Sequence, residues 1–352
     1  MSRNRGDVLP FSHAIFHCPF RLPVVQSTQT AWEVFPMRDI IIASAITVGI
    51  IILLVLAAAL VCYLMVFRSP RRQTFSGDEY DLPQGEIYEP HWEQMKQWQR
   101  MIRNMPCREM SVVSFDGLTL RGRYYECDPN APIELMFHGY KGTAERDMSG
   151  GVARSFSVGH NALLIEQRGA CRSEGNTITF GVREYRDCLT WTEYAVQQFG
   201  KDCRLILAGI SMGASTVIMA GGNKLPPNVK YILADCGFSS PREIIRKVMK
   251  DRKLPVKLVY PIVRLGALLF GGFDPEEWSP VEAVKCCEVP VILFHGEADD
   301  FVPCEMSRQI YDACTAPKKL VTIPGAGHGL AYPVDPEGYI AALTEFKQQC
   351  GV

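Results

Sequence analysis

The sequence predicts an α/β fold, in which helices cover both faces of a mainly parallel β-sheet and one transmembrane helix precedes the sheet. A chain of 352 residues that is 47% hydrophobic and 21% charged can bury a large core. Residues 40–67 form an uncharged, apolar stretch. After residue 109, short apolar runs alternate with longer segments of helical periodicity, which is the pattern of strands joined by crossover helices.

The charge balance argues against one class of partner. The chain carries 37 Lys and Arg against 38 Asp and Glu, which gives a net charge of -1. Proteins that neutralise a phosphate backbone need a basic excess, so we expect no nucleic-acid partner.

Residues 39–67 are predicted to be a single-pass membrane anchor. A bilayer core about 30 Å thick needs about 20 helical residues, and a soluble helix of this length normally keeps a charged face. A cleaved signal peptide is disfavoured, because its apolar region spans only about 7–15 residues. Arg38 precedes the stretch, whereas Arg68, Arg71 and Arg72 follow it, and this asymmetry favours a cytoplasmic catalytic portion.

The cysteines point to the same compartment. Of the 13 cysteines, all but Cys18 and Cys62 follow the anchor, and their spacing fits no disulfide framework. They are interpreted as free thiols in a reducing environment.

Two segments flank the anchor. Residues 1–38 form a leader without periodic pattern, and translation starting at Met37 would omit residues 1–36 of it. Residues 68–90 are rich in charge, Pro and Gly and are interpreted as a tether to a domain over residues 91–352.

The domain begins with an amphipathic helix over residues 91–104, which packs either on the domain itself or on a membrane surface. Asp116-Gly117 then lies between two strand-like segments and predicts a hairpin. Strands are expected at 110–115, 118–125, 133–137, 162–165, 205–208, 231–234, 289–294 and 320–323. Helices are expected at 146–157, 181–199, 212–223, 304–315 and 336–348. Residues 238–285 contain too much helix for one crossover and predict an insertion above the sheet.

The segment G-I-S-M-G, residues 209–213, identifies a candidate nucleophile. It follows an apolar strand directly and opens a helix. A serine on such a strand-to-helix turn projects above the edge of the sheet, and its small neighbours allow the strained backbone to pass close to other elements. We therefore expect Ser211 to be the nucleophile.

A serine hydroxyl needs a base, and the base needs an orienting carboxylate. The strand at 289–294 runs into H-G-E-A-D-D-F-V-P, where Asp299 is the expected acid and Glu297 and Asp300 are its rivals. The strand at 320–323 runs into P-G-A-G-H-G, which contains the expected base, His328. Their order along the chain is Ser, Asp, His, which is the order in hydrolases whose nucleophilic serine lies on such a strand-to-helix turn. This order disfavours His138 and His295 as the base.

Attack on a carbonyl also requires two N–H donors for the developing oxyanion. One is expected at the backbone of Met212, directly after the nucleophile. The other is expected at Tyr140, in the loop H-G-Y-K-G that follows the strand at 133–137.

Over residues 108–348 these motifs resemble the α/β-hydrolase superfamily, and within it the bacterial esterase, lipase and serine-aminopeptidase-like group. The segment from Glu166 to Gly175 is similar to that group's D-x-R-G-x-G-x-S-x-G loop but departs from it at Glu166 and Cys171. Cys171 lies between two arginines that could lower the pKa of its thiol, although an inert thiol is the simpler interpretation. The resemblance implies an eight-stranded sheet, a helical lid over residues 238–285 and acyl-enzyme chemistry without a cofactor.

The expected function is therefore that of a membrane-anchored serine hydrolase acting on carboxylic esters, with a small-molecule or lipid-like acyl ester as substrate. The same residues would also serve amide, peptide or thioester cleavage. An inactive, membrane-tethered scaffold is the alternative from another class. We expect no metal and no cofactor, since the sequence contains no H-E-x-x-H, paired C-x-x-C or phosphate-loop motif.

Overall fold

The structure is a computed structural model that describes residues 37–69 and 79–351. The expected leader and much of the expected tether, residues 1–36 and 70–78, lie outside the described residues. The chain divides into two compact units, which meet between Ile50 and Ile51. The second unit holds the sheet, its helices and the C-terminal half of the first helix.

An eight-stranded sheet with the order β1-β2-β4-β3-β5-β6-β7-β8 forms the centre of the second unit. The first two strands form an antiparallel hairpin and β2 runs antiparallel to β4, whereas all later pairs are parallel. The strands are β1 (Arg108–Val113), β2 (Thr119–Tyr125), β3 (Ile133–Phe137), β4 (Asn161–Glu166), β5 (Leu205–Ile210), β6 (Val229–Asp235), β7 (Val291–Gly296) and β8 (Lys318–Ile323). The expected fold class is confirmed, including the hairpin.

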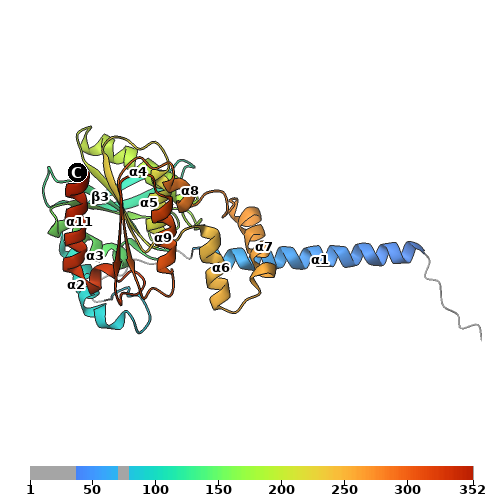
Figure 1. The fold of residues 1–352 in the computed structure, drawn as a ribbon. Helices are drawn as coiled ribbons and strands as arrows, with labels where there is room; N and C mark the ends of the chain where they lie inside the picture. The colour runs from blue at the N-terminus through green and yellow to red at the C-terminus, as the bar shows by residue number, and fades with distance from the viewer. Residues whose placement is uncertain (1–36, 70–78, 352) are drawn as a thin grey trace, which may run out of the picture. The chain divides into compact units, whose positions relative to one another are not determined.

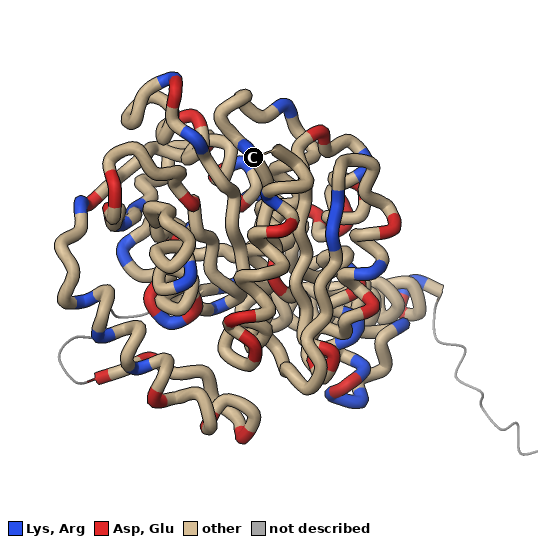
Figure 2. Tube along the Cα trace, turned by 60° about the vertical axis from the view of Figure 1, so that its left-hand side comes forward, with Lys and Arg blue, Asp and Glu red and all other residues tan. Residues whose placement is uncertain are grey.

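Helices cover both faces of this sheet (Figure 1). One face carries α2 (Trp92–Asn104), α3 (Ala144–Ser157), α10 (Ala331–Val334) and α11 (Pro336–Cys350). The other carries α4 (Glu184–Phe199), α5 (Met212–Gly221), α8 (Pro280–Val284) and α9 (Cys304–Ala313). Charges of both signs are interspersed along the described chain (Figure 2).

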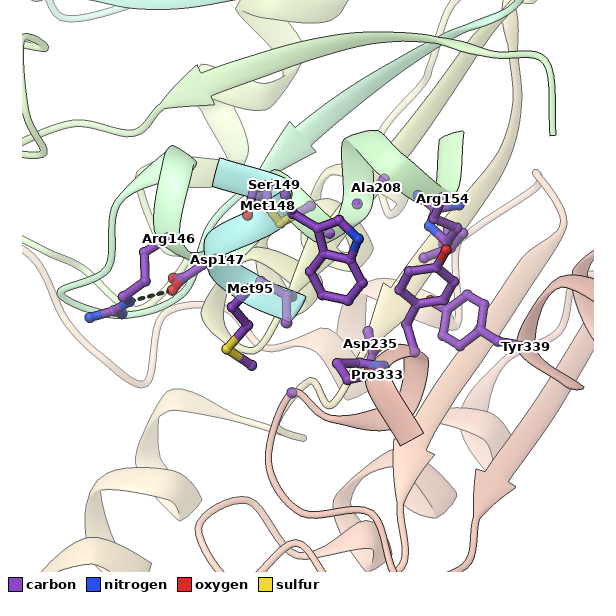
Figure 3. A pocket seen from close by; sticks show the side chains of 18 residues that line it. Met95, Arg146, Asp147, Met148, Ser149, Arg154, Ala208, Asp235, Pro333 and Tyr339 are labelled. Carbon is purple, nitrogen blue, oxygen red and sulfur yellow. Dashed lines mark hydrogen bonds and ion pairs between the residues drawn. The ribbon is translucent and has the colours of Figure 1, made fainter. Parts of the chain in front are cut away.

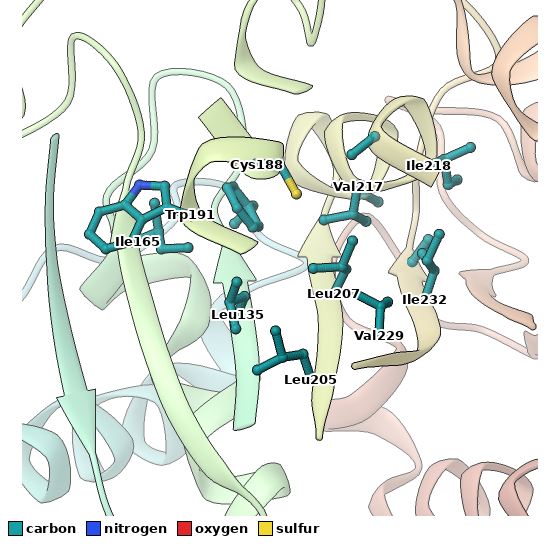
Figure 4. Packing of buried hydrophobic residues seen from close by; sticks show 14 of the residues in the cluster. Leu135, Ile165, Cys188, Trp191, Leu205, Leu207, Val217, Ile218, Val229 and Ile232 are labelled. Atoms are coloured by element: carbon teal, nitrogen blue, oxygen red, sulfur yellow. The ribbon is translucent and has the colours of Figure 1, made fainter. Parts of the chain in front are cut away.

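Alternation along the central strands builds two cores. On β3, Leu135 and Phe137 point into the core beneath α4 and α5, whereas Met136 points into the core beneath α2 and α3. Each of these side chains has no exposed surface. Figure 4 shows the first core, where Trp191 and Cys188 of α4 pack over Leu135 and Ile165. Fully buried strands read as continuous apolar runs for this reason.

The insertion after β6 forms α6 (Pro241–Asp251), α7 (Val256–Gly266) and a short π-helix, η2 (Ala267–Gly271). We call these three helices the lid. The sequence analysis extended the lid to residue 285, but α8 packs against α5 and α9 and belongs to the helical layer on the sheet. The reason is that Val284 is fully buried in the core beneath that layer.

Helix α1 (Met37–Val66) is long and apolar enough to cross a membrane. A short 3-10 turn, η1 (Glu89–His91), precedes α2. Part of the expected tether is ordered against the domain: Pro83 accepts a hydrogen bond from the Trp92 indole, at 3.0 Å, and Asp81 accepts one from Gln99, at 2.8 Å. Both acceptors are backbone carbonyls, which every residue has, so the sequence of residues 79–90 does not predict these two hydrogen bonds.

Candidate active site

Ser211 lies on a sharp turn between β5 and α5, in a left-handed conformation with φ 55°. The turn requires both glycines of the motif. A Cβ on Gly213 would lie 1.9 Å from the carbonyl oxygen of Phe137, and a Cβ on Gly209 would lie 2.2 Å from that of Gly213. The Ser211 N–H donates to the Asp235 carbonyl of β6, at 2.8 Å, which fixes the turn to the neighbouring strand.

Three predicted side chains form one hydrogen-bonded series. His328 Nε2 lies 2.9 Å from Ser211 Oγ, and His328 Nδ1 lies 2.7 Å from Asp299 Oδ2. Asp299 has a fully buried side chain, and its other oxygen accepts the N–H groups of Phe301, at 3.0 Å, and Val302, at 2.8 Å. This is the geometry in which an imidazole can take a proton from a hydroxyl.

The electrostatics of this series favour an ionised acid. Burial would raise the pKa of Asp299, but the hydrogen bonds from His295 and His328 outweigh it and hold that pKa well below its ordinary value. The carboxylate is therefore charged at neutral pH and can stabilise a protonated His328.

His295, which the sequence analysis disfavoured as the base, is a second support for Asp299. The ring is fully buried; its Nδ1 lies 2.6 Å from Ser307 Oγ and its Nε2 lies 3.3 Å from Asp299 Oδ2. Since the first residue after a strand's apolar run often lies in the site, its position at the end of β7 was the available signal.

The rivals of Asp299 lie elsewhere. Glu297 accepts a hydrogen bond from Thr322, at 2.7 Å, and Asp300 is exposed and accepts Lys247 at its carbonyl. His138 is buried and accepts the Gln167 N–H, at 3.1 Å. None of these three is hydrogen-bonded to Ser211 within the described part of the chain.

The loop after β3 passes directly beside the nucleophile, since a Cβ on Gly139 would lie 3.4 Å from the Ser211 Cβ. The Gly139 N–H is held by Asp147 Oδ2 of α3, at 2.9 Å. The next N–H in this loop, that of Tyr140, and the N–H of Met212 have no protein acceptor among the described residues. Both are therefore available to an oxyanion.

Asp147 is a functional residue that the sequence analysis missed. Burial would raise the pKa of its carboxyl, but the Arg146 guanidinium, 2.6 Å away, lowers it below the ordinary value. Figure 3 shows this ion pair at the start of α3. The sequence signal was an acidic residue in the first turn of a helix, which normally indicates nothing more than a favourable helix dipole.

Two hollows meet at Ser211. The first, which we call the apolar cavity, has a volume of about 260 Å³ and lies beneath the lid and the end of α1. The second is a more polar cleft of about 560 Å³, lined by residues 83–88 together with Tyr140 and His328. Tyr88 closes one side of the cleft by donating from its hydroxyl to the His328 carbonyl, at 3.0 Å.

Burial raises the pKa of two thiols that sequence or position singles out, Cys171 and Cys236. Burial raises the pKa of the Cys171 thiol to about 12, so the flanking arginines do not activate it. The Cys236 thiol lies within 4.8 Å of the Asp299 and His328 ligand atoms, and burial raises its pKa well above the ordinary value. These three groups could be read as metal ligands, but the imidazole nitrogens are already hydrogen-bonded to Ser211 and Asp299.

Arg168, in the loop that resembles the hydrolase motif, serves the fold. Its guanidinium forms paired hydrogen bonds with Asp187, at 2.6 and 2.7 Å, and with Asp116, at 3.0 and 3.1 Å. It thus ties the hairpin turn to α4.

Residues 175–351, half of the chain, match the model of the prolyl oligopeptidase family. The chain belongs to the prolyl oligopeptidase family. This prolyl oligopeptidase family member has the α/β-hydrolase fold.

The family member is also similar to individual proteins. Protein YqkD of Bacillus subtilis is 25% identical over 190 residues, which cover 54% of this chain and 62%, less than two thirds, of that relative. The thiohydrolase aneE of Aspergillus aculeatus is 22% identical over 298 residues and matches across 68% of this chain and 92% of its own length. An esterase of Pyrococcus furiosus superposes with a TM-score of 0.59 at 18% identity, covering 81% of this chain and 98% of that chain. The last likeness establishes the fold alone.

Proposed function

We propose that the protein is a membrane-anchored hydrolase that cleaves carboxylic esters through an acyl-enzyme. The observation that carries the proposal is the series Ser211, His328, Asp299, with distances of 2.9 and 2.7 Å, at the junction of the apolar cavity and the polar cleft. An ester has an acyl side and an alcohol side, and the site offers a separate space for each.

In the proposed reaction, Ser211 Oγ attacks the ester carbonyl while His328 takes the hydroxyl proton. The N–H groups of Tyr140 and Met212 stabilise the negative carbonyl oxygen of the tetrahedral intermediate. His328 then returns its proton to the departing alcohol, and an acyl-Ser211 ester is left. Water then attacks the acyl carbonyl while His328 takes a proton from it. His328 returns this proton to Ser211 Oγ, which releases the carboxylic acid and restores the serine hydroxyl. Asp299 orients the imidazole and stabilises its charged form throughout.

The lining of the apolar cavity favours an ester over a peptide. It consists mostly of Ile, Val, Met, Leu and Phe side chains, which offer few partners for hydrogen bonding. A peptide backbone would bury N–H and C=O groups there without partners, at a substantial free-energy cost, whereas a hydrocarbon chain has no such groups. Thioester cleavage is a second candidate, because a relative that matches over 92% of its own length carries the name thiohydrolase.

The membrane part of the proposal rests on α1. Its 30 residues have a mean hydropathy of 3.0 over the most apolar window, and Arg68, Arg71 and Arg72 follow it. These features support one span with the hydrolase domain in the cytoplasm.

Labelling with a fluorophosphonate probe tests the proposal. The full chain is used in detergent, as wild type, Ser211→Ala, His328→Ala and the matched control Ser157→Ala, whose hydroxyl donates to the Arg154 carbonyl of its own helix, at 2.8 Å. We expect labelling of the wild type and of Ser157→Ala, and none of the other two. A folded wild type that takes no label would instead indicate an inactive scaffold.

A substrate series then separates the reaction classes. An ester, a thioester and an anilide of one acyl group are compared by kcat/KM. The ester should be the best substrate; an anilide that is cleaved equally fast would transfer the assignment to amide chemistry.

A further inference from the structure

The wall of the apolar cavity comes from two parts of the chain that are distant in sequence. Cys62, Met65 and Val66, in the last two turns of α1, form one side, and Ile245 and Val248 of α6 belong to another. Ser211 lies in the lining as well. Among the described lining residues, Arg252 alone is charged. The cavity is therefore an apolar space that connects the end of α1 to the nucleophile.

Close packing fixes the α1 side of this wall. A Cβ on Gly266 of α7 would lie 2.4 Å from the Ala59 carbonyl, so the two helices approach as closely as a glycine permits. Ala59 has no exposed surface, and the Tyr63 hydroxyl lies 2.8 Å from Thr177 Oγ1. Figure 1 shows α6 and α7 beside the C-terminal end of α1. The end of α1 is thus a built part of the cavity.

The end of α1 is also hydrogen-bonded to the loop that supplies an oxyanion donor. The Tyr140 hydroxyl donates to the Val66 carbonyl, at 2.5 Å, and Lys141 Nζ donates to the Met65 carbonyl, at 2.8 Å. The last carbonyls of a helix lack partners within the helix and need such donors. The same contacts fix the Tyr140 side chain beside the cavity that it lines.

The lid also carries exposed apolar side chains, one of which contacts the end of α1. Four large apolar side chains of the lid are exposed: Leu258 (71%), Leu268 (44%), Leu269 (53%) and Phe270 (40%). The Phe270 ring lies 6.1 Å from the Tyr63 ring of α1. Clustered exposed apolar side chains indicate an interaction surface, and here they adjoin a helix long and apolar enough to span a bilayer.

We propose that the apolar cavity binds the hydrocarbon chain of a fatty-acyl ester and that the last two turns of the membrane anchor form part of this acyl site. The inference rests on the proposed function and extends it, because it assigns a substrate class to the same serine. The acyl chain lies between α1 and α6 with its carbonyl at Ser211, and the alcohol portion occupies the cleft lined by residues 83–88. The chain enters from the bilayer, past the exposed side of the lid.

Acyl-chain length provides the first test. Burying one methylene is worth about a fourfold gain in binding, so kcat/KM of the full-length wild type should rise by about that factor for each carbon until the cavity is filled. Esters from acetate to dodecanoate are compared below their micellar concentrations. A flat profile, or a preference for acetate, would overturn the proposal.

Two matched substitutions test the α1 wall. Cys62→Trp places a large ring in the cavity, whereas Val61→Trp, on the adjacent residue, points away from it and is 53% exposed. The measured quantity is kcat/KM for the decanoate ester divided by kcat/KM for the acetate ester. Cys62→Trp should lower this ratio at least tenfold, and Val61→Trp should leave it unchanged. Val248→Trp, from the opposite wall, should act like Cys62→Trp. An equal effect of the Cys62 and Val61 substitutions would contradict the assignment.

A binding measurement separates this inference from the proposed function. Ser211→Ala removes the hydroxyl but leaves the wall intact, so it should bind decanoate in a calorimetric titration, and Ser211→Ala combined with Cys62→Trp should not. Decanoate binding without fluorophosphonate labelling of the wild type would retain the acyl site and refute the hydrolase. Labelling without decanoate binding would do the reverse.

The route by which the acyl chain of the substrate reaches the cavity is tested with one ester presented in two ways. The full chain, reconstituted in vesicles, receives the ester either within the same bilayer or in water as monomers. Faster turnover of the bilayer ester supports entry past the lid, and turnover of the dissolved ester alone would overturn that route.

Discussion

At the scale of single residues, Asp147 is a positioning residue that sequence analysis did not identify. It contacts neither nucleophile nor base, yet it holds the Gly139 N–H at 2.9 Å and so sets the path of the loop that presents Tyr140. Asp147→Asn should lower kcat about tenfold with little change in KM, because an oxyanion donor acts mainly in the transition state.

The control for Asp147→Asn is Glu145→Gln, a neighbour on α3 whose carboxylate pairs with Arg103 and Arg123. It should affect stability but not the balance of kcat and KM. Steady-state kinetics with one chromogenic ester check both variants. A higher KM with unchanged kcat in Asp147→Asn would show that the residue acts on substrate binding instead.

Asp235, labelled with Tyr339 in Figure 3, is a buried carboxyl that lowers the stability of the folded state. Its Oδ1 is buried without a hydrogen-bond partner in the described structure, and burial raises its pKa to about 6. The folded state therefore binds more protons than the unfolded chain between about pH 4 and 6, so this carboxyl lowers the stability as the pH rises through that window. Asp235→Asn should raise the free energy of unfolding at pH 7.5 by roughly 1 to 3 kcal/mol, and by less at pH 5.

Denaturant unfolding at the two pH values measures this effect. Asp187→Asn is the contrast. Burial raises the pKa of Asp187 to about 6 as well, but its carboxylate forms two hydrogen bonds with Arg168, and its loss leaves that buried cation with Asp116 alone. It should destabilise the protein. Destabilisation by both substitutions at pH 7.5 would mean that the Asp235 carboxylate has a favourable role that its surroundings do not reveal.

Sequence reasoning reached the side chains that follow strands and missed those that act across elements. Ser211, Asp299 and His328, which the structure hydrogen-bonds in series, each follow an apolar run in a recognisable order. The catalytic roles of these three residues stay predictions until the labelling experiment has been done. Asp147 and His295 were not assigned, because each acts through a hydrogen bond or ion pair with the loop next to its own element, and no hydrophobic period encodes such a contact.

At the scale of secondary structure, periodicity located every strand of the sheet, while ends depended on particular side chains. The helix expected from residue 181 begins at Glu184, whose carboxylate accepts the N–H groups of Thr179 and Gly181, at 2.8 and 2.9 Å. Residues 79–90 have a tether-like composition but are held by hydrogen bonds to distant groups. Neither feature is encoded by a local hydrophobic pattern.

The junction after α1 makes a prediction at this scale. Phe67 is fully buried, with its ring 5.8 Å from that of Phe180 and 5.2 Å from that of Phe273. Phe67→Ala should therefore cost about 3 to 5 kcal/mol of stability in the full chain. Leu64→Ala, three residues earlier and 40% exposed, should cost less than about 1 kcal/mol.

Thermal unfolding in detergent distinguishes the two variants. Equal, small effects would mean that the residues after α1 act as a loose connection, and the packing described here would not contribute to stability.

At the scale of the whole molecule, the orientation of the anchor can be read from its thiols. Cys127 and Cys286 are free and exposed on the hydrolase unit. If the unit lies in the cytoplasm, a membrane-impermeant maleimide should modify them only after the cells are permeabilised. Mass spectrometry of the two peptides measures this, with the buried Cys188 as the unmodified control. Modification in intact cells would place the unit outside.

The fold class followed from the sequence because a parallel sheet covered on both faces imposes a repeating pattern on the whole chain. An acyl ester substrate was predicted, but the place of an acyl site was not, because the lid and the end of α1 define the cavity only once they are packed together. Their residues look like ordinary helix packing until Ala59 and Gly266 are seen in contact.

That contact also has a consequence for biosynthesis. The ribosome completes Ala59 and Phe67 long before Gly266 and Phe273, so the apolar surface at the end of the anchor must wait for its partners until most of the chain has been made. Domains fold as units and from the N-terminus during synthesis. An anchor that is already inserted would shelter this surface in lipid during the wait, and the nascent enzyme would assemble on its own membrane.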